Sequence, residues 1–203
     1  MPFCQTFKQE IEELKGKAQN INALLLKYKE TGDENIAQEL DAILKEIEEF
    51  KEKFKNEATR LIEEFIQRRD NKNEPIEIIF DETDFRFIIK GNLGFDSRTH
   101  LNDFPNLIKE LRGYLSANKV QILDLPKLRK AGSIYANNAQ TINLPNLEEA
   151  DYISANKVQI LNIPKLRKAY NIYADNAQTI NLPNLEEADD IYANNAQIIN
   201  LPN

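Results

Sequence analysis

The sequence predicts an α+β protein in which an N-terminal antiparallel helical hairpin caps a right-handed β-solenoid of about five coils. Residues 1–74 carry apolar side chains at alternating gaps of four and three, which is the spacing of paired helices. Residues 113–203 consist of a sequence motif that repeats every 19 residues. A repeat length near 20 residues is typical of solenoids. The repeat is marked by Ala117, Ala136, Ala155, Ala174 and Ala193, and by Pro126, Pro145, Pro164, Pro183 and Pro202. We therefore divide the chain into residues 1–74, 75–112 and 113–203.

Composition disfavours several classes of function. The 203 residues carry a net charge of −7, and neither residues 1–74 nor residues 113–203 are net basic, so nucleic acid binding is not expected. The single Cys4 excludes an internal disulfide and a cysteine-rich metal site. The sequence contains no run of 18 apolar residues, which a membrane-spanning helix would need, and no recognisable signal peptide. We expect a soluble cytoplasmic protein; export by a route without a recognisable signal peptide is the alternative.

The first segment reads as two helices joined by a tight turn. One helix is expected over residues 6–29, and a second begins near Glu34, after Gly32 as a C-cap and Asp33 as an N-cap. Their apolar seams are Phe7, Ile11, Leu14, Ala18, Ile21, Leu25 and Tyr28, and Ile36, Leu40, Ile43, Ile47, Phe50 and Phe54. The second helix outruns the first, so its last turns, with Ala58, Leu61 and Phe65, should pack on the start of the solenoid. The hairpin either covers the open end of the solenoid or pairs two chains in a four-helix bundle.

The middle segment reads as a β-hairpin followed by a loop. Two apolar runs, residues 76–80 and 85–90, are separated by four polar residues, 81–84, which is a hairpin signature. Residues 91–103 are expected to form a loop. This loop holds His100, the single histidine of the chain, and a lone histidine without a second ligand nearby predicts no site.

One repeat, residues 134–151, shows how a coil is built. Alternation predicts one short strand at Ile134 and Ala136 and another at Ile142 and Leu144, which Pro145 ends. The corner residues 137 and 138 are asparagines, which tolerate the left-handed conformation of a tight turn. The side chains expected to face inward are Ile134, Ala136, Ala139, Ile142, Leu144, Leu147 and Ala150, the last two on the return path.

The string Leu-Pro-Asn-Leu-Glu-Glu-Ala followed by Ile-x-Ala resembles the leucine-rich repeat. It is similar to the short proline-containing repeats of bacterial effector proteins and to the repeats of receptor L domains, over residues 104–203. The resemblance implies a parallel sheet along one face and a protein partner bound there. The chain departs from the family where a corner asparagine is expected, so a plain β-solenoid remains the alternative. The residues at that position are Val120, Ala139, Val158, Ala177 and Ala196.

Charge alternates from coil to coil. Residues 116–151 match residues 154–189 at 31 of 36 positions, which indicates duplication of a two-coil unit. The charged doublets are Arg129-Lys130, Glu148-Glu149, Arg167-Lys168 and Glu186-Glu187. Because equivalent positions of stacked coils lie about 4.8 Å apart, opposite charges should meet and disfavour a slip by one coil. Stacked side-chain amides should also form ladders, at Asp124, Asn143, Asn162, Asn181 and Asn200, and at Gln121, Gln140, Gln159, Gln178 and Gln197.

Five of the seven tyrosines fall at the outward positions beside the Ile or Leu of the first strand. They are Tyr114, Tyr135, Tyr152, Tyr173 and Tyr192. Corner residues next to them complete the expected binding face: Asn118, Asn137, Asn156, Asp175 and Asn194. Tyrosine, serine and asparagine are favoured in recognition surfaces, although tyrosine also suits any strand surface.

Nothing in the sequence has the pattern of a catalytic, cofactor or metal site. We therefore expect a non-enzymatic protein-binding module without a cofactor. The alternative is a structural or self-assembling scaffold, with chains joined through the helical hairpin or the open C-terminal coil. In that coil Ile191, Ala193, Ile199 and Leu201 should be exposed on one side.

Overall fold

The computed structural model describes residues 3–69, 73–95 and 106–202, with the side chains of residues 3–6 and 8 left undescribed. The chain divides into two compact units, residues 1–60 and residues 61–203. Two helices are followed by a parallel β-solenoid of about five coils, so the α+β class is confirmed. Residues 96–103 of the expected loop, with His100, lie outside the described residues.

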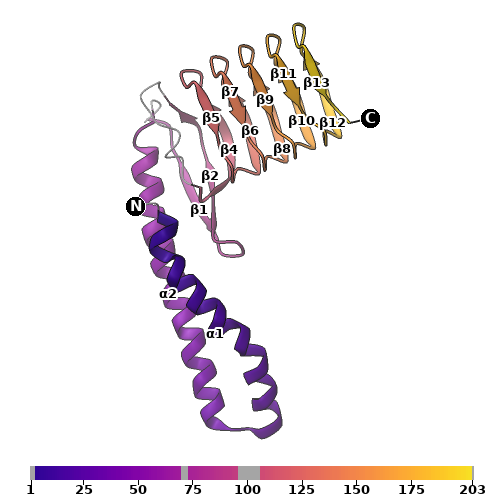
Figure 1. Ribbon diagram of the computed structural model, residues 1–203. Coiled ribbons are helices and arrows are strands. Elements are labelled where there is room, and N and C mark those ends of the chain that lie inside the picture. The colour runs from indigo at the N-terminus through magenta and orange to yellow at the C-terminus, as the bar shows by residue number, and fades with distance from the viewer. Residues whose placement is uncertain (1–2, 70–72, 96–105, 203) are drawn as a thin grey trace. The chain divides into compact units, whose positions relative to one another are not determined.

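The first unit is an antiparallel helical hairpin. Helix α1 (Phe3–Thr31) and helix α2 (Glu34–Ile66) are joined by Gly32 and Asp33 (Figure 1). Gly32 has a positive φ of 64° and donates its N–H to the carbonyl of Tyr28, so it ends α1 as a C-cap. The carboxylate of Asp33 accepts the N–H of Asn35 at 2.9 Å and caps α2.

Aromatic packing and ion pairs hold the hairpin near its open end. The ring of Phe7 lies 5.9 Å from that of Phe50 and 5.4 Å from that of Phe54. Lys53 binds Glu10 at 2.6 Å across the two helices. The expected heptad seam is less complete toward the turn, where Ala18, Leu25 and Tyr28 are exposed. In a two-helix hairpin each helix packs against a single neighbour. The apolar face of each helix is therefore less completely buried than it would be in a larger helical bundle.

The second unit begins with the last turns of α2. Ile62, Phe65 and Ile66 are buried, and the Phe65 ring lies 5.0 Å from the ring of Phe95. The helix end therefore packs on the entry to the solenoid, as the sequence predicted. Ile62 is buried at the position that was expected for Leu61, because the next buried residue after Ala58 follows four residues later and not three.

A β-hairpin starts the larger sheet. Strands β1 (Glu77–Asp81) and β2 (Arg86–Lys90) are antiparallel, with Phe85 in the turn at a φ of 55°. Strand β2 also pairs in parallel with β4 (Ile108–Ser116). The expectation of an unbroken loop after residue 90 is wrong, because β3 (Leu93–Gly94) pairs in parallel with β4. A strand of two residues is too short to show alternation in the sequence.

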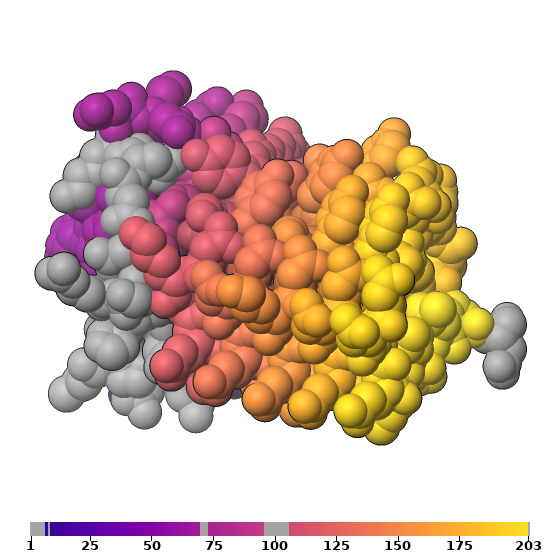
Figure 2. All heavy atoms as spheres, turned by 90° about the horizontal axis from the view of Figure 1, so that it is seen from above, coloured from indigo at the N-terminus to yellow at the C-terminus, as the bar shows by residue number. Residues whose placement is uncertain are grey.

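The coils are built from the parallel strands of two sheets. The eight-stranded sheet has the order β1-β2-β4-β6-β8-β10-β12, with β3 also paired to β4. Its further long strands are β6 (Lys130–Tyr135), β8 (Glu149–Ser154), β10 (Lys168–Tyr173) and β12 (Glu187–Tyr192). The second sheet contains β5 (Ile122–Asp124), β7 (Thr141–Asn143), β9 (Ile160–Asn162), β11 (Thr179–Asn181) and β13 (Ile198–Asn200). Figure 2 shows the coils as successive layers in chain order.

The core of each coil is narrow and apolar. All seven side chains predicted to face inward in residues 134–151 are buried. Ala150, however, lies in the long strand β8 and not on the return path. The sequence missed this because the inward positions of the long strand, such as Ala150 and Ile153, are three residues apart and break the alternation of two.

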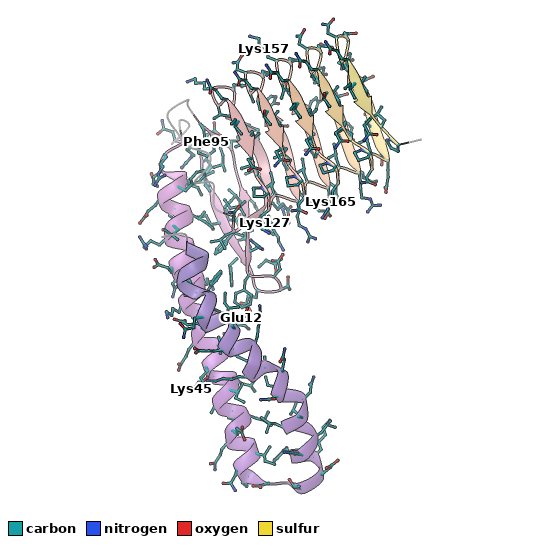
Figure 3. The ribbon with its side chains drawn as sticks, viewed as in Figure 1. Glu12, Lys45, Phe95, Lys127, Lys157 and Lys165 are labelled. Atoms are coloured by element: carbon teal, nitrogen blue, oxygen red, sulfur yellow. The ribbon has the colours of Figure 1, made fainter. Side chains whose placement is uncertain are left out.

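Two rows of turns close the coils. In one row the N–H of Ala139 binds the carbonyl of Ala136 at 3.0 Å, and in the other Leu147 binds Leu144 at 3.2 Å across Pro145. Lys157 marks the asparagine row and Lys165 the proline row, at opposite ends of the strands (Figure 3). The expected left-handed asparagines are not found: among the described residues other than glycine, Phe85 alone has a positive φ. The four-residue turn closes without one, and the asparagines act through their side chains.

Candidate protein-binding face

The five tyrosines lie together on the outer face of the eight-stranded sheet. They form two columns, because Tyr114 and Tyr152 are in register with Ser133, and Tyr173 is in register with both Ser154 and Tyr192. The rings of Tyr173 and Tyr192 stack at a centroid distance of 4.8 Å, and those of Tyr152 and Tyr173 at 6.5 Å. Tyr114 meets Tyr135 edge to face at 6.2 Å. The sheet register therefore gathers tyrosines that lie 17 to 21 positions apart along the chain into one aromatic surface.

The five corner residues of the expected binding face are engaged in the fold. Asn137 donates its backbone N–H to the amide oxygen of Asn118 at 2.9 Å, and Asn156 donates to Asn137 at 3.2 Å. Asp175 and Asn194 continue the same ladder. These side chains bind the next coil, so they stabilise the corner of the solenoid. Their side chains remain half-buried or exposed beside the tyrosines, so their place in a binding face stays a prediction.

A groove of about 860 Å³ crosses the strands on the same outer face. Its lining includes Gly113, Gly132, Tyr114 and Tyr135. A Cβ on Gly132 would lie 2.4 Å from the carbonyl oxygen of Gly113, and a Cβ on Gly113 would lie 2.2 Å from that of Gly91. Glycine is therefore required where the backbones of successive coils approach one another.

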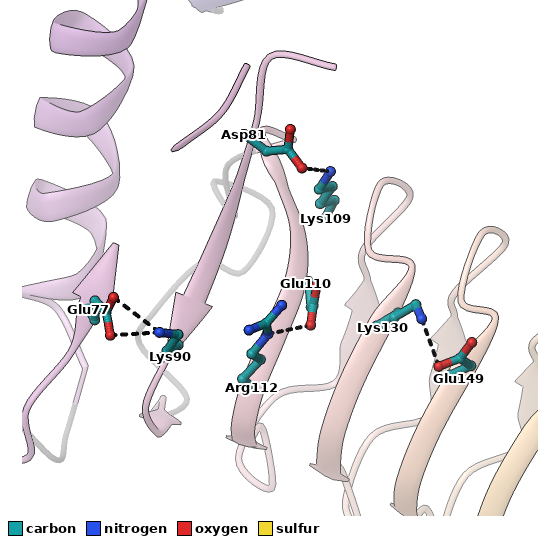
Figure 4. A network of polar contacts seen from close by, with 8 residues as sticks. All are labelled: Glu77, Asp81, Lys90, Lys109, Glu110, Arg112, Lys130 and Glu149. Atoms are coloured by element: carbon teal, nitrogen blue, oxygen red, sulfur yellow. Dashed lines mark hydrogen bonds and ion pairs between the residues drawn. The ribbon is translucent and has the colours of Figure 1, made fainter. Parts of the chain in front are cut away.

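Ion pairs between coils also line the groove. Lys130 binds Glu149 at 2.9 Å and Lys168 binds Glu187 at 2.7 Å. Figure 4 shows the first of these pairs beside the Glu110–Arg112 pair of β4. The predicted alternation of charge is confirmed here and at the Arg129–Glu148 and Arg167–Glu186 pairs. The hydrogen bond from Arg167 lowers the pKa of the Glu186 carboxyl, and the one to Glu187 raises the pKa of Lys168.

Three further residues of the groove were not singled out in the sequence. Asp151, Tyr170 and Asp189 follow the inward alanine of three successive long strands and line the groove. The Tyr170 side chain is 59% exposed. Comparison of the duplicated units would have pointed to it, because Gly132 in the first unit corresponds to Tyr170 in the second.

The outer face of the five-stranded sheet carries the predicted amide ladder. Asn143 donates to Asp124 at 2.9 Å, and Asn162, Asn181 and Asn200 each donate to the preceding coil. Beside it runs a row of alternating isoleucine and threonine, and the two rows line a groove of about 600 Å³. The glutamines meet through their backbones, as in the bond from Gln140 N–H to the carbonyl of Gln121.

Comparison of the chain with known proteins found no matching family, curated protein or solved structure. Within the described residues, no group of three or more His, Cys, Asp or Glu is placed to hold a metal ion. None of the described helices is long and apolar enough to cross a membrane.

Proposed function

We propose that the chain is a non-enzymatic protein-binding module whose contact surface is the outer face of the eight-stranded sheet. The observation that carries the proposal is the gathering of five tyrosines from five neighbouring long strands onto this face. Tyrosine presents a large, rigid contact area and a hydroxyl at a low cost in conformational entropy. The resemblance of residues 104–203 to leucine-rich repeats supports the same face, since that resemblance implies a protein bound on the parallel sheet.

Rigidity also supports the proposal. The strands under the tyrosines are fixed by parallel pairing, by the buried isoleucines Ile134, Ile153 and Ile172, and by the corner ladder. A surface that is ordered before binding loses little entropy when a partner docks. Stacking of Tyr173 on Tyr192 likewise holds both rings in place.

The test replaces Tyr135, Tyr173 and Tyr192 together by serine. A partner captured by the wild-type chain is identified by mass spectrometry, and its affinity is measured for both proteins by calorimetry. We expect the triple variant to keep its thermal midpoint and to lose at least about tenfold in affinity. The control is Tyr28→Ser on the helical hairpin, which should bind as the wild type does. Unchanged affinity in the triple variant contradicts the proposal.

A second candidate function is that of a self-assembling scaffold. The observation that favours it is the last described coil, where the inward-facing Ile199 and Leu201 are exposed next to the strand edges of β12 and β13. Exposed strand edges are templates for pairing with another chain.

A further inference from the structure

We propose that the groove across the eight-stranded sheet receives an extended, arginine-bearing segment of the partner, with Asp151, Tyr170 and Asp189 as the residues that read its charge. This inference rests on the proposed function and names the chemistry of the partner. It concerns residues outside the tyrosine columns described above.

The first step is the charge that remains in the groove after its ion pairs are formed. The lining contains three cationic side chains, and each is bound to a carboxylate: Arg112 to Glu110, Lys130 to Glu149 and Lys168 to Glu187. The two remaining carboxylates of the lining are Asp151 and Asp189. No ion pair of either is found among the described residues. The groove therefore offers a net negative charge to whatever enters it.

The second step is the arrangement of these two carboxylates around an aromatic ring. Ala150, Ala169 and Ala188 are in register on β8, β10 and β12, so the residues that follow them, Asp151, Tyr170 and Asp189, come from adjacent strands. Neighbouring strands lie about 4.8 Å apart, so each carboxylate is roughly one strand spacing from the strand of Tyr170. An aromatic face between two carboxylates is suited to a cation, which gains from the ring and from both charges.

The groove suits the guanidinium group of arginine better than the ammonium group of lysine or an anionic group. A guanidinium is planar, stacks on an aromatic ring and donates several hydrogen bonds in a fixed fork, so it can contact the Tyr170 ring and an aspartate together. An ammonium group can also bind carboxylates, but it is a compact charge without a plane that stacks on the ring. Phosphate groups and acidic peptides are repelled by Asp151 and Asp189. Gly113 and Gly132 line the groove without side chains, so the backbone of an extended segment can lie there beside the bound side chain.

The experiment uses the full 203-residue chain and a labelled peptide with the sequence Gly-Arg-Gly-Arg-Gly-Arg-Gly as the probe. Binding is followed by fluorescence anisotropy at low ionic strength. We expect the double variant Asp151→Asn/Asp189→Asn to bind at least about tenfold more weakly than wild type. Tyr170→Ser should lose roughly threefold, whereas Tyr170→Phe, which keeps the ring, should bind as the wild type does.

The matched control removes two charges elsewhere. Glu39 and Asp41 are exposed on α2, so Glu39→Gln/Asp41→Asn makes the same change in net charge outside the groove. This control should bind the peptide as the wild type does. An equal loss in both double variants shows attraction by overall charge alone and overturns the inference. Equal binding of a peptide with citrulline in place of arginine overturns it as well.

Failure of this inference and failure of the proposed function give different results. If a protein partner depends on Tyr135, Tyr173 and Tyr192 but not on Asp151 and Asp189, the proposed function stands and the arginine proposal is wrong. If the peptide depends on the aspartates while no protein partner depends on the tyrosines, arginine recognition is supported and the protein-binding function is contradicted.

Discussion

Alanine at the end of each long strand sets how narrow the interior of a coil is. Ala136, Ala155 and Ala174 are fully buried between the two sheets. We expect Ala155→Leu to overpack this interior and to lower the free energy of unfolding by about 1–3 kcal/mol, measured by urea denaturation. The control, Lys157→Leu, enlarges an exposed turn residue of the same coil and should change stability by less than about 0.5 kcal/mol. A stable Ala155→Leu variant would show that the alanine has room on its inner side.

Glycine at two places makes a matched pair of tests. Gly132→Ala places a methyl group against the carbonyl oxygen of Gly113, so we expect a loss of about 1–3 kcal/mol in unfolding free energy. Gly16 lies in α1 with no atom within 4 Å of an added Cβ, so Gly16→Ala should instead stabilise the helix by about 0.5–1 kcal/mol. Urea denaturation followed by circular dichroism measures both. Equal effects of the two substitutions would contradict the close approach of the coils.

At this scale the sequence predicts what is constant from coil to coil. The inward alanines could be predicted because they return every 19 residues between polar neighbours. The role of Asn137 could not be predicted. Asparagine in a turn can act through a left-handed backbone conformation or through side-chain hydrogen bonds, and both roles give the same sequence pattern. Asp151 and Tyr170 were missed because the residue at their position is not the same from coil to coil, so the 19-residue repeat does not mark it.

The β1–β2 hairpin is tied to strand β4 by a partly exposed charge cluster. Lys109 binds Asp81 at 2.7 Å and Asp84 at 3.1 Å, and the Thr83 hydroxyl donates to Asp81 at 2.6 Å. These bonds hold the pKa of Asp81 well below its ordinary value, the hydrogen bond from Lys109 being the largest cause. Burial alone would lower the pKa of Lys109, but its bonds to both aspartates outweigh burial and raise it.

The lowered pKa of Asp81 predicts how stability depends on pH. The Asp81 charge stabilises the folded state fully above the unfolded-state pKa of about 4, and this contribution is lost as the pH falls toward the lower folded-state pKa. We expect Asp81→Asn to lower the thermal midpoint at pH 7 and to differ progressively less from wild type below pH 4. Scanning calorimetry across this pH range checks the expectation. A difference that stays constant with pH would contradict a role for the charge.

Elements were predicted well where a local signal marks them. The turn at Gly32 and Asp33 could be placed because glycine and aspartate are the residues that end and begin helices. Strand β3 could not, because its two residues form a strand only through pairing with β4, which follows it in the chain. The long strands were predicted too short for a related reason: their inward residues, such as Ala150 and Ile153, are three apart and do not show a period of two.

At the scale of the whole chain, the last described coil differs from the coils before it. Ile180 and Leu182 are fully buried, whereas the equivalent Ile199 and Leu201 are 46% and 39% exposed. Within residues 1–203 the strands β12 and β13 end their sheets. Of the four residues predicted to be exposed in this coil, Ile199 and Leu201 are exposed and Ile191 and Ala193 are half-buried. The inner coils are covered by their successors, which buries the equivalent residues there.

A chain of residues 1–203 should therefore associate through this coil. Pairing of two such ends covers apolar surface and unpaired strand edges at once, both of which favour association. We expect sedimentation velocity to show dimers or larger species at high protein concentration, and Ile199→Lys to reduce them strongly, since it places a charge in the contact.

Ile122→Lys is the control, because Ile122 is exposed on the outer face of the opposite, first coil. A wild type that stays monomeric rules the association out, and a dimer unchanged by Ile199→Lys moves the contact to the helical hairpin, where Leu26 and Leu44 are exposed.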